Sequence, residues 1–155
     1  MIYPRKGNYR RIDFEIQLNP LVDHLSIGGS DDEKGYSGFS IRLKLPEEVL
    51  FSDLQGAVEP MNAAVIAGNT MKIDGRFLRN GGNGGVLIYS NPGNPEPSNR
   101  WILRKSASMQ NVAYPGRNPI TIPMDHPLTL NYSLLIYRGN LSQNEIKKVL
   151  KDIHH

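Results

Sequence analysis

The sequence predicts an all-β protein, an antiparallel β-sandwich with one short C-terminal α-helix. Three observations predict it. Short apolar runs alternate with polar residues at a period of two, which is typical of half-buried strands. The 15 glycines and 11 prolines are spread between these runs, where turns are needed. Only residues 142–153 repeat their apolar side chains at helical spacing. We interpret residues 1–155 as a single β-sandwich domain, a usual length for one domain.

The first half of the chain contains the clearest alternation. In residues 10–18 every second side chain from Ile12 to Leu18 is apolar, so we expect a strand with one face in the core. Residues 39–45 repeat this pattern, and Pro46 ends it. Shorter strands are expected at residues 21–27, 49–51, 58–66 and 71–73.

The second half begins with a glycine-rich stretch, residues 79–85, which we expect to be a flexible connection. Ser142 and Glu145 have the spacing of a capping box and predict the start of the helix. Strands are expected at residues 86–89, 101–104, 120–122 and 128–137, the last being the strongest run of the chain.

Composition excludes several classes of function. The absence of cysteine excludes disulfides, a thiolate zinc site and a cysteine nucleophile. Lys and Arg exceed Asp and Glu by only 18 to 15, without a basic face rich in aromatics, so no nucleic-acid partner is expected. No apolar run is long enough to span a membrane, and no motif predicts a cofactor or a metal. Periplasm and cytoplasm both fit this composition.

Two acidic clusters are interpreted as ordinary surface. Asp13 and Glu15 lie two residues apart on one strand, which places their carboxylates about 7 Å apart, within the range of an inverting glycosidase. They nevertheless occupy the polar positions of an alternating strand, so a solvated face is favoured. The adjacent acids of residues 31–33 lack the spacing of a calcium loop and are interpreted as a turn. His154–His155 resembles a tag remnant and is left out of site reasoning.

The densest mixture of amide, aromatic and guanidinium groups lies in residues 84–117. Residues 90–100 form a proline-rich loop, and residues 108–117 are expected to form a polar loop. Such amides suit either a ligand or a structural cap, and the single Trp suits either a sugar platform or the core. The candidate ligand-binding residues are Asn91, Asn94, Trp101, Gln110, Asn111, Tyr114, Arg117 and His126.

Four blocks in order resemble the PmoA-like family of uncharacterised bacterial proteins: GYSGFSIRLKLP (35–46), VEPMNAAV (58–65), GGVLIYSNPGNPEPSNRWILR (84–104) and PLTLNYSLLIYRG (127–139). The resemblance covers roughly residues 10–150. It implies a sandwich similar to sugar-mutarotase-like supersandwiches and a role connected with carbohydrate. It also implies that these blocks match the C-terminal half of a longer family domain, so the chain is expected to be either a fragment or a short version whose other half a second copy supplies. Where the chain has Ser90-Asn91-Pro92, relatives are expected to carry Asp-His-Pro, so an acid–base pair is replaced here.

Three hypotheses of function follow. The first is a non-catalytic glycan-binding or accessory role, with a carbohydrate or another polyhydroxylated small molecule as partner. The second is a sugar hydrolase or epimerase with its site on loops 90–100 and 108–117. Its only nearby acids and bases are Glu96, Asp125 and His126, so no catalytic residue is assigned. The third is a structural homodimer that pairs through an exposed sheet edge.

Overall fold

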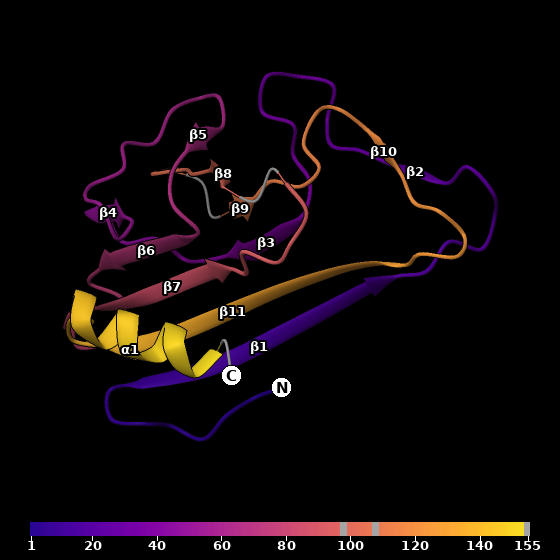
Figure 1. Ribbon diagram of the computed structural model, residues 1–155. Helices are drawn as coiled ribbons and strands as arrows, with labels where there is room; N and C mark the ends of the chain where they lie inside the picture. The colour runs from indigo at the N-terminus through magenta and orange to yellow at the C-terminus, as the bar shows by residue number, and fades with distance from the viewer. Residues whose placement is uncertain (97–98, 107–108, 154–155) are drawn as a thin grey trace.

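The computed structural model describes residues 1–96, 99–106 and 109–153, and it confirms an antiparallel β-sandwich with one C-terminal helix (Figure 1). Pro97, the third proline of the expected proline-rich loop, and Ser108, the first residue of the expected polar loop, lie outside the described residues. The same holds for His154–His155.

Two antiparallel sheets form the sandwich, and Figure 1 shows the smaller one above the larger. The larger sheet has the strand order β1-β11-β7-β6-β4 and the smaller one β3-β9-β8-β5. The larger sheet contains β1 (Tyr9–Leu18), β4 (Val49–Ser52), β6 (Thr70–Gly75), β7 (Gly84–Ser90) and β11 (Leu128–Arg138). The smaller contains β3 (Phe39–Arg42), β5 (Val65–Ile66), β8 (Arg100–Ile102) and β9 (Met109–Val112). A separate ribbon pairs β2 (Ser26–Ile27) with β10 (Ile120–Thr121).

The main core lies between the two sheets. Met71, Ile73 and Ile88 of the larger sheet are fully buried, and they belong to one apolar cluster with Trp101 and Val112 of the smaller sheet. Each apolar side chain of this kind contributes about 1.5–3 kcal/mol when fully buried. Burial of these apolar side chains between the two sheets therefore holds the sandwich together.

A second apolar layer lies on the opposite, outer face of the larger sheet. There α1 (Gln143–Ile153) packs Ile146 and Val149 against Leu87 and Leu135. Figure 1 shows the helix lying across the end of β11 and its neighbouring strands. The strand β7 is consequently buried along its whole length, because side chains cover both of its faces. This helix is too short to cross a membrane.

The capping box is present as expected. The backbone N–H of Ser142 donates to Glu145 Oε2 at 2.8 Å, and the backbone N–H of Glu145 donates to Ser142 Oγ at 3.3 Å. Each residue thus satisfies a backbone donor that the first helical turn leaves without a partner.

Only the end of the glycine-rich stretch 79–85 differs from the expectation of a flexible connection, because residues 79–83 connect β6 to β7 through a turn. Gly84 and Gly85 are buried at the start of β7. Gly85 is directly opposite Tyr137 on β11, and a Cβ atom at Gly85 would clash with the backbone carbonyl oxygen of Ile73 and lie 2.5 Å from the tyrosine hydroxyl oxygen. Glycine is needed here because the backbone of β6 and the side chain of Tyr137 leave no space for a Cβ atom.

Other strands are shorter than expected. Of residues 58–66 only Val65–Ile66 is a strand, because Pro60 has no N–H to donate to a ladder. Of residues 21–27 only Ser26–Ile27 is a strand, and Leu21 is almost fully exposed. These short strands bury too few side chains for alternation to identify their ends.

The N-terminal segment covers part of the β1 edge. The backbone N–H of Tyr3 donates to Arg11 O at 3.0 Å, and that of Asp13 donates to Met1 O at 2.8 Å. An edge that is already paired cannot recruit a second chain at those positions. The hypothesis of a homodimer through a sheet edge therefore has to rest on another edge.

Candidate functional site

The expected polar loop 108–117 is wrong in its first part, because Met109–Val112 forms β9. Gln110 and Asn111 are fully buried. The Gln110 side chain accepts from the N–H of Arg104 and donates to its carbonyl, both at 2.9 Å, and so replaces a backbone pairing. Asn111 Nδ2 donates to Ser37 O at 2.6 Å and to Phe39 O at 3.1 Å. Both amides hold the smaller sheet together and are shielded from any ligand.

Trp101 and Tyr114 also belong to the interior. Trp101 is fully buried, and its Nε1 donates to Gly68 O at 2.9 Å. Tyr114 is buried too, which raises the pKa of its hydroxyl. Neither ring offers a face to a sugar.

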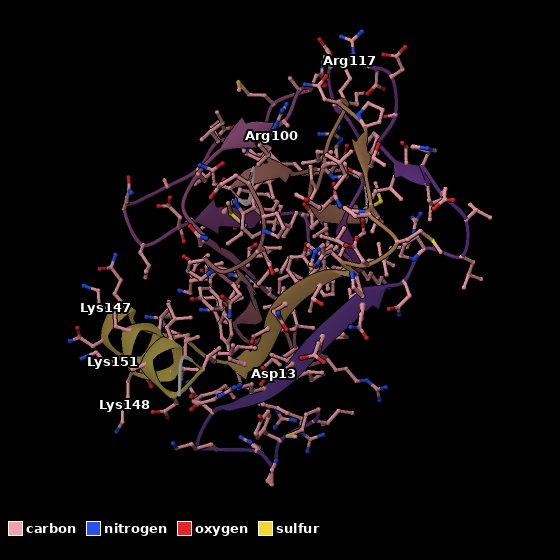
Figure 2. The ribbon with its side chains drawn as sticks, turned by 45° about the vertical axis from the view of Figure 1, so that its right-hand side comes forward. Asp13, Arg100, Arg117, Lys147, Lys148 and Lys151 are labelled. Carbon is pink, nitrogen blue, oxygen red and sulfur yellow. The ribbon has the colours of Figure 1, made fainter. Side chains whose placement is uncertain are left out.

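Arg117 and His126 lie at the surface. Arg117 Nε donates to Asp31 Oδ1 at 2.9 Å, in an ion pair whose two side chains are mostly exposed. His126 Nε2 lies 3.5 Å from Asp125 Oδ2, and about four-fifths of each side chain is exposed. Figure 2 places Arg117 at the opposite end of the molecule from Asp13. Arg117 therefore lies far from Asn91, which lines a pocket together with Asp13, although the two loops touch where the N–H of Ala113 donates to Arg100 O at 2.9 Å.

Asn91 and Asn94 anchor the loop after β7 to β11. Asn94 is buried, its Nδ2 donates to Asn131 O at 2.8 Å, and its Oδ1 accepts from the Asn131 N–H at 2.7 Å. The Asn91 side-chain oxygen accepts from the N–H of Gly93 at 2.8 Å. These hydrogen bonds hold Asn91 beside the outer face of the larger sheet.

A pocket of about 410 Å³ opens on that face, and we call it the outer-face pocket. Strand pairing explains its lining, because Asp13 is opposite Ser133 and Glu15 is opposite Asn131. Their neighbours Phe14 and Tyr132 join the inner core, so these four polar side chains share the outer side. The lining residues that bear polar side chains are Tyr3, Arg11, Asp13, Glu15, Asn91, Asn131, Tyr132 and Ser133.

The Asp13 carboxylate is fixed within this pocket. Its Oδ1 accepts from Arg11 Nε at 2.8 Å and from Ser133 Oγ at 2.7 Å. Burial alone would raise the pKa of Asp13, but the hydrogen bonds from Arg11 and Ser133 outweigh it and lower the pKa. The Arg11 guanidinium also lies over the Tyr3 ring, 4.5 Å from its centroid. The result is a preorganised carboxylate–guanidinium–hydroxyl unit.

Other polar groups in the pocket are free to bind. The Glu15 carboxylate, the Asn131 side chain and Asn91 Nδ2 make no hydrogen bond or ion pair within the described part of the chain. Glutamate offers acceptors, the Asn131 amide offers both a donor and an acceptor, and Asn91 offers the donor Nδ2. Free groups of both kinds thus surround a fixed carboxylate.

The electrostatics of Asp13 suit a hydrogen-bond acceptor rather than a proton donor. Asp13, Asp32, Asp53 and Glu145 are the described carboxylates with a resolved pKa shift, and all four pKa values are lowered. A general acid needs a raised pKa at neutral pH. Among the described residues no group of three His, Asp or Glu side chains could hold a metal ion.

Sequence reasoning missed Arg11, Ser133 and Asn131, and it interpreted Asp13 and Glu15 as solvated surface. A signal was present: residues 129, 131 and 133 are polar within the longest apolar strand. What the sequence does not reveal is that β1 and β11 are neighbours, which places the polar positions of both strands side by side.

Fold and pocket together define a β-sandwich protein with a polar pocket on its helix-bearing face. A family model described as a family of unknown function (DUF6807) matches residues 1–151, and the chain belongs to this family. No curated protein and no solved structure matches the chain significantly. The family match covers the range of the resemblance noted in the sequence. These comparisons support neither the PmoA-like name nor the sugar-mutarotase-like fold.

Proposed function

We propose that this protein is a non-catalytic binding module for a carbohydrate or a similar polyhydroxylated small molecule, held in the outer-face pocket. The observation that carries the proposal is the set of free groups around a fixed centre. Among the described residues, Asn91 Nδ2, the Asn131 side chain and the Glu15 carboxylate have no partner, and they line the same pocket as the Asp13 carboxylate, which Arg11 and Ser133 immobilise.

A polyhydroxylated ligand suits this set because each hydroxyl both donates and accepts. Carboxylate oxygens accept from hydroxyls, and amides bind them in either sense. The volume of about 410 Å³ lies within the usual range of small-molecule pockets. An acceptor that is already held in place loses little conformational entropy on binding, which improves affinity.

A sugar hydrolase or epimerase at loops 90–100 and 108–117 receives less support. Both reactions need an acid and a base that converge on one shielded site. The pair His126–Asp125 is solvent-exposed, and Gln110 and Asn111 are buried in structural hydrogen bonds. In the outer-face pocket Asp13 has a lowered pKa, which suits an acceptor rather than a proton donor.

Calorimetric titration with a panel of neutral and acidic oligosaccharides tests the proposal. We expect at least one to bind, and we expect Asn131→Ala to weaken that affinity about three- to tenfold, the usual effect of one lost hydrogen bond. Asn144→Ala is the matched control, since it removes an exposed amide on α1, away from the pocket.

The absence of heat with every member of the panel would contradict the proposal. Equal affinity in wild type and Asn131→Ala would place the ligand elsewhere. Release of a shortened or epimerised sugar during the titration would favour the enzyme hypothesis instead.

A further inference from the structure

A second cavity lies on the inner side of the larger sheet, at the end where β11 finishes, and we call it the arginine-rimmed groove. Its volume is about 570 Å³. Its apolar wall is formed by Leu43, Phe77, Leu78, Val86 and Ile136, and its rim carries Arg5, Arg10 and Arg138. No Asp or Glu lines it within the described part of the chain.

Strand register accounts for this arrangement. Arg10 on β1 is directly opposite Ile136 on β11, which places their Cβ atoms about 5 Å apart on one side of the sheet. Arg138 follows Ile136 by two residues, so it projects from that same side about 7 Å further along the strand. The register thus places two guanidinium groups around one apolar side chain.

The charges of this rim are not neutralised by the protein. Within the described residues neither Arg10 nor Arg138 has an ion pair or a side-chain hydrogen bond, while Arg5 Nε donates only to the carbonyl of Gly7. Like charges that share one face repel each other, and an anion held between them removes that repulsion. A guanidinium also matches a carboxylate in geometry and binds it through two parallel hydrogen bonds.

The apolar wall of the groove suits a ligand with an apolar part. Ile136 is 45% exposed although it lies on the side of β11 that elsewhere faces the core. An alkyl chain over Ile136 and Val86 would remove this apolar surface from water. The volume of the groove is also within the usual range of ligand pockets.

We propose that the arginine-rimmed groove binds an amphipathic monocarboxylate, with its alkyl chain on Ile136 and Val86 and its carboxylate between Arg10 and Arg138. This site lies on the other side of the sheet from the outer-face pocket. It does not depend on the proposed carbohydrate function, and its variants affect different residues.

Titration with octanoate below its micellar concentration, followed by amide shifts in 1H–15N NMR spectra, tests the proposal. We expect the shifts to concentrate at Val86, Ile136 and Arg138. Octan-1-ol has the same chain without the charge, and we expect it to bind at least about tenfold more weakly. Octanoate affinity should fall as salt concentration rises, because the rim is exposed.

Two variants and one control locate the carboxylate. Arg10→Gln and Arg138→Gln should each weaken octanoate binding about tenfold and leave octan-1-ol binding unchanged. Arg117→Gln removes the same charge at another end of the molecule and should behave as wild type (Figure 2). All three side chains are exposed, so the variants should fold. Equal affinity for octanoate and octan-1-ol, or an equal loss in Arg117→Gln, would overturn the proposal.

Discussion

At the scale of single residues, chemically similar side chains have opposite uses in this protein. Asn111 is fully buried and donates to backbone carbonyls, whereas the side chain of Asn131 is free in a pocket. Nothing in the residue types separates the two. What separates them is strand pairing, because β9 lies inside the smaller sheet and Asn131 faces outward from the larger one. The sequence therefore shows which hydrogen-bonding side chains are present, but not which of them are exposed.

We expect Asn111→Asp to destabilise the fold more than Asn111→Ala. The alanine variant removes the donor that Asn111 Nδ2 provides to the carbonyls of Ser37 and Phe39, at about 1–3 kcal/mol of unfolding free energy. The aspartate variant has the same size but places a buried carboxylate against those carbonyl oxygens. Urea unfolding at pH 7 measures both. If Asn111→Asp is as stable as wild type, the donor role assigned to this amide is wrong.

We expect stability to fall as pH rises above about 10, the pKa of an unfolded tyrosine. Burial raises the pKa of Tyr89 and of Tyr132 to about 12, and burial with a hydrogen bond to Asp74 raises that of Tyr137 still further. Above about pH 10 the folded state thus keeps tyrosine protons that the unfolded state releases. Each such tyrosine therefore lowers the free energy of unfolding by about 1.4 kcal/mol per pH unit in this range.

Urea unfolding at pH 9, 10 and 11 measures this dependence, with Tyr132→Phe as the comparison. The variant has one buried hydroxyl fewer, so its stability should fall less steeply above pH 10. Identical slopes in the two proteins would show that Tyr132 does not contribute.

At the scale of elements, long segments were predictable and short ones were not. The strands at residues 10–18 and 128–137 and the capped helix were expected from their patterns and are present. The expected strand at residues 58–66 is reduced to Val65–Ile66, and the expected loop at 108–117 begins with β9. In β9 the buried side chain of Gln110 is polar and is hydrogen-bonded to the backbone of Arg104. A pattern of alternating apolar residues cannot identify such a strand. Local polarity therefore misidentifies a strand whose amides are satisfied inside the sheet.

We expect Ser142→Ala to weaken α1 by about 1 kcal/mol, because it removes the hydroxyl that accepts from the N–H of Glu145. Amide hydrogen exchange at the start of the helix should become faster, and the pairs of β1 with β11 should be unaffected. Asn144→Ala is the control, because it changes a residue in the same helical turn that is not part of the capping box. Unchanged exchange in Ser142→Ala would mean that packing of Ile146 and Val149 alone holds the helix.

At the scale of the whole molecule, the outer-face pocket is assembled from segments far apart in the chain. The N-terminal segment contributes Tyr3, β1 contributes Asp13, the loop after β7 contributes Asn91, and β11 contributes Asn131. Their meeting depends on the strand order β1-β11-β7, which joins the first strand to the last. The sequence identifies Asn91 as a candidate residue and places Asp13 on the polar face of a strand, but local patterns contain no information about the strand order.

The most direct test of the central claim is where a bound oligosaccharide contacts the protein. Amide shifts in 1H–15N NMR spectra, recorded during titration with whichever sugar binds best, locate that contact. The proposed function requires the largest shifts at Asp13, Asn91, Asn131 and Ser133. Largest shifts at residues 113–118, with the outer-face pocket unperturbed, would contradict it.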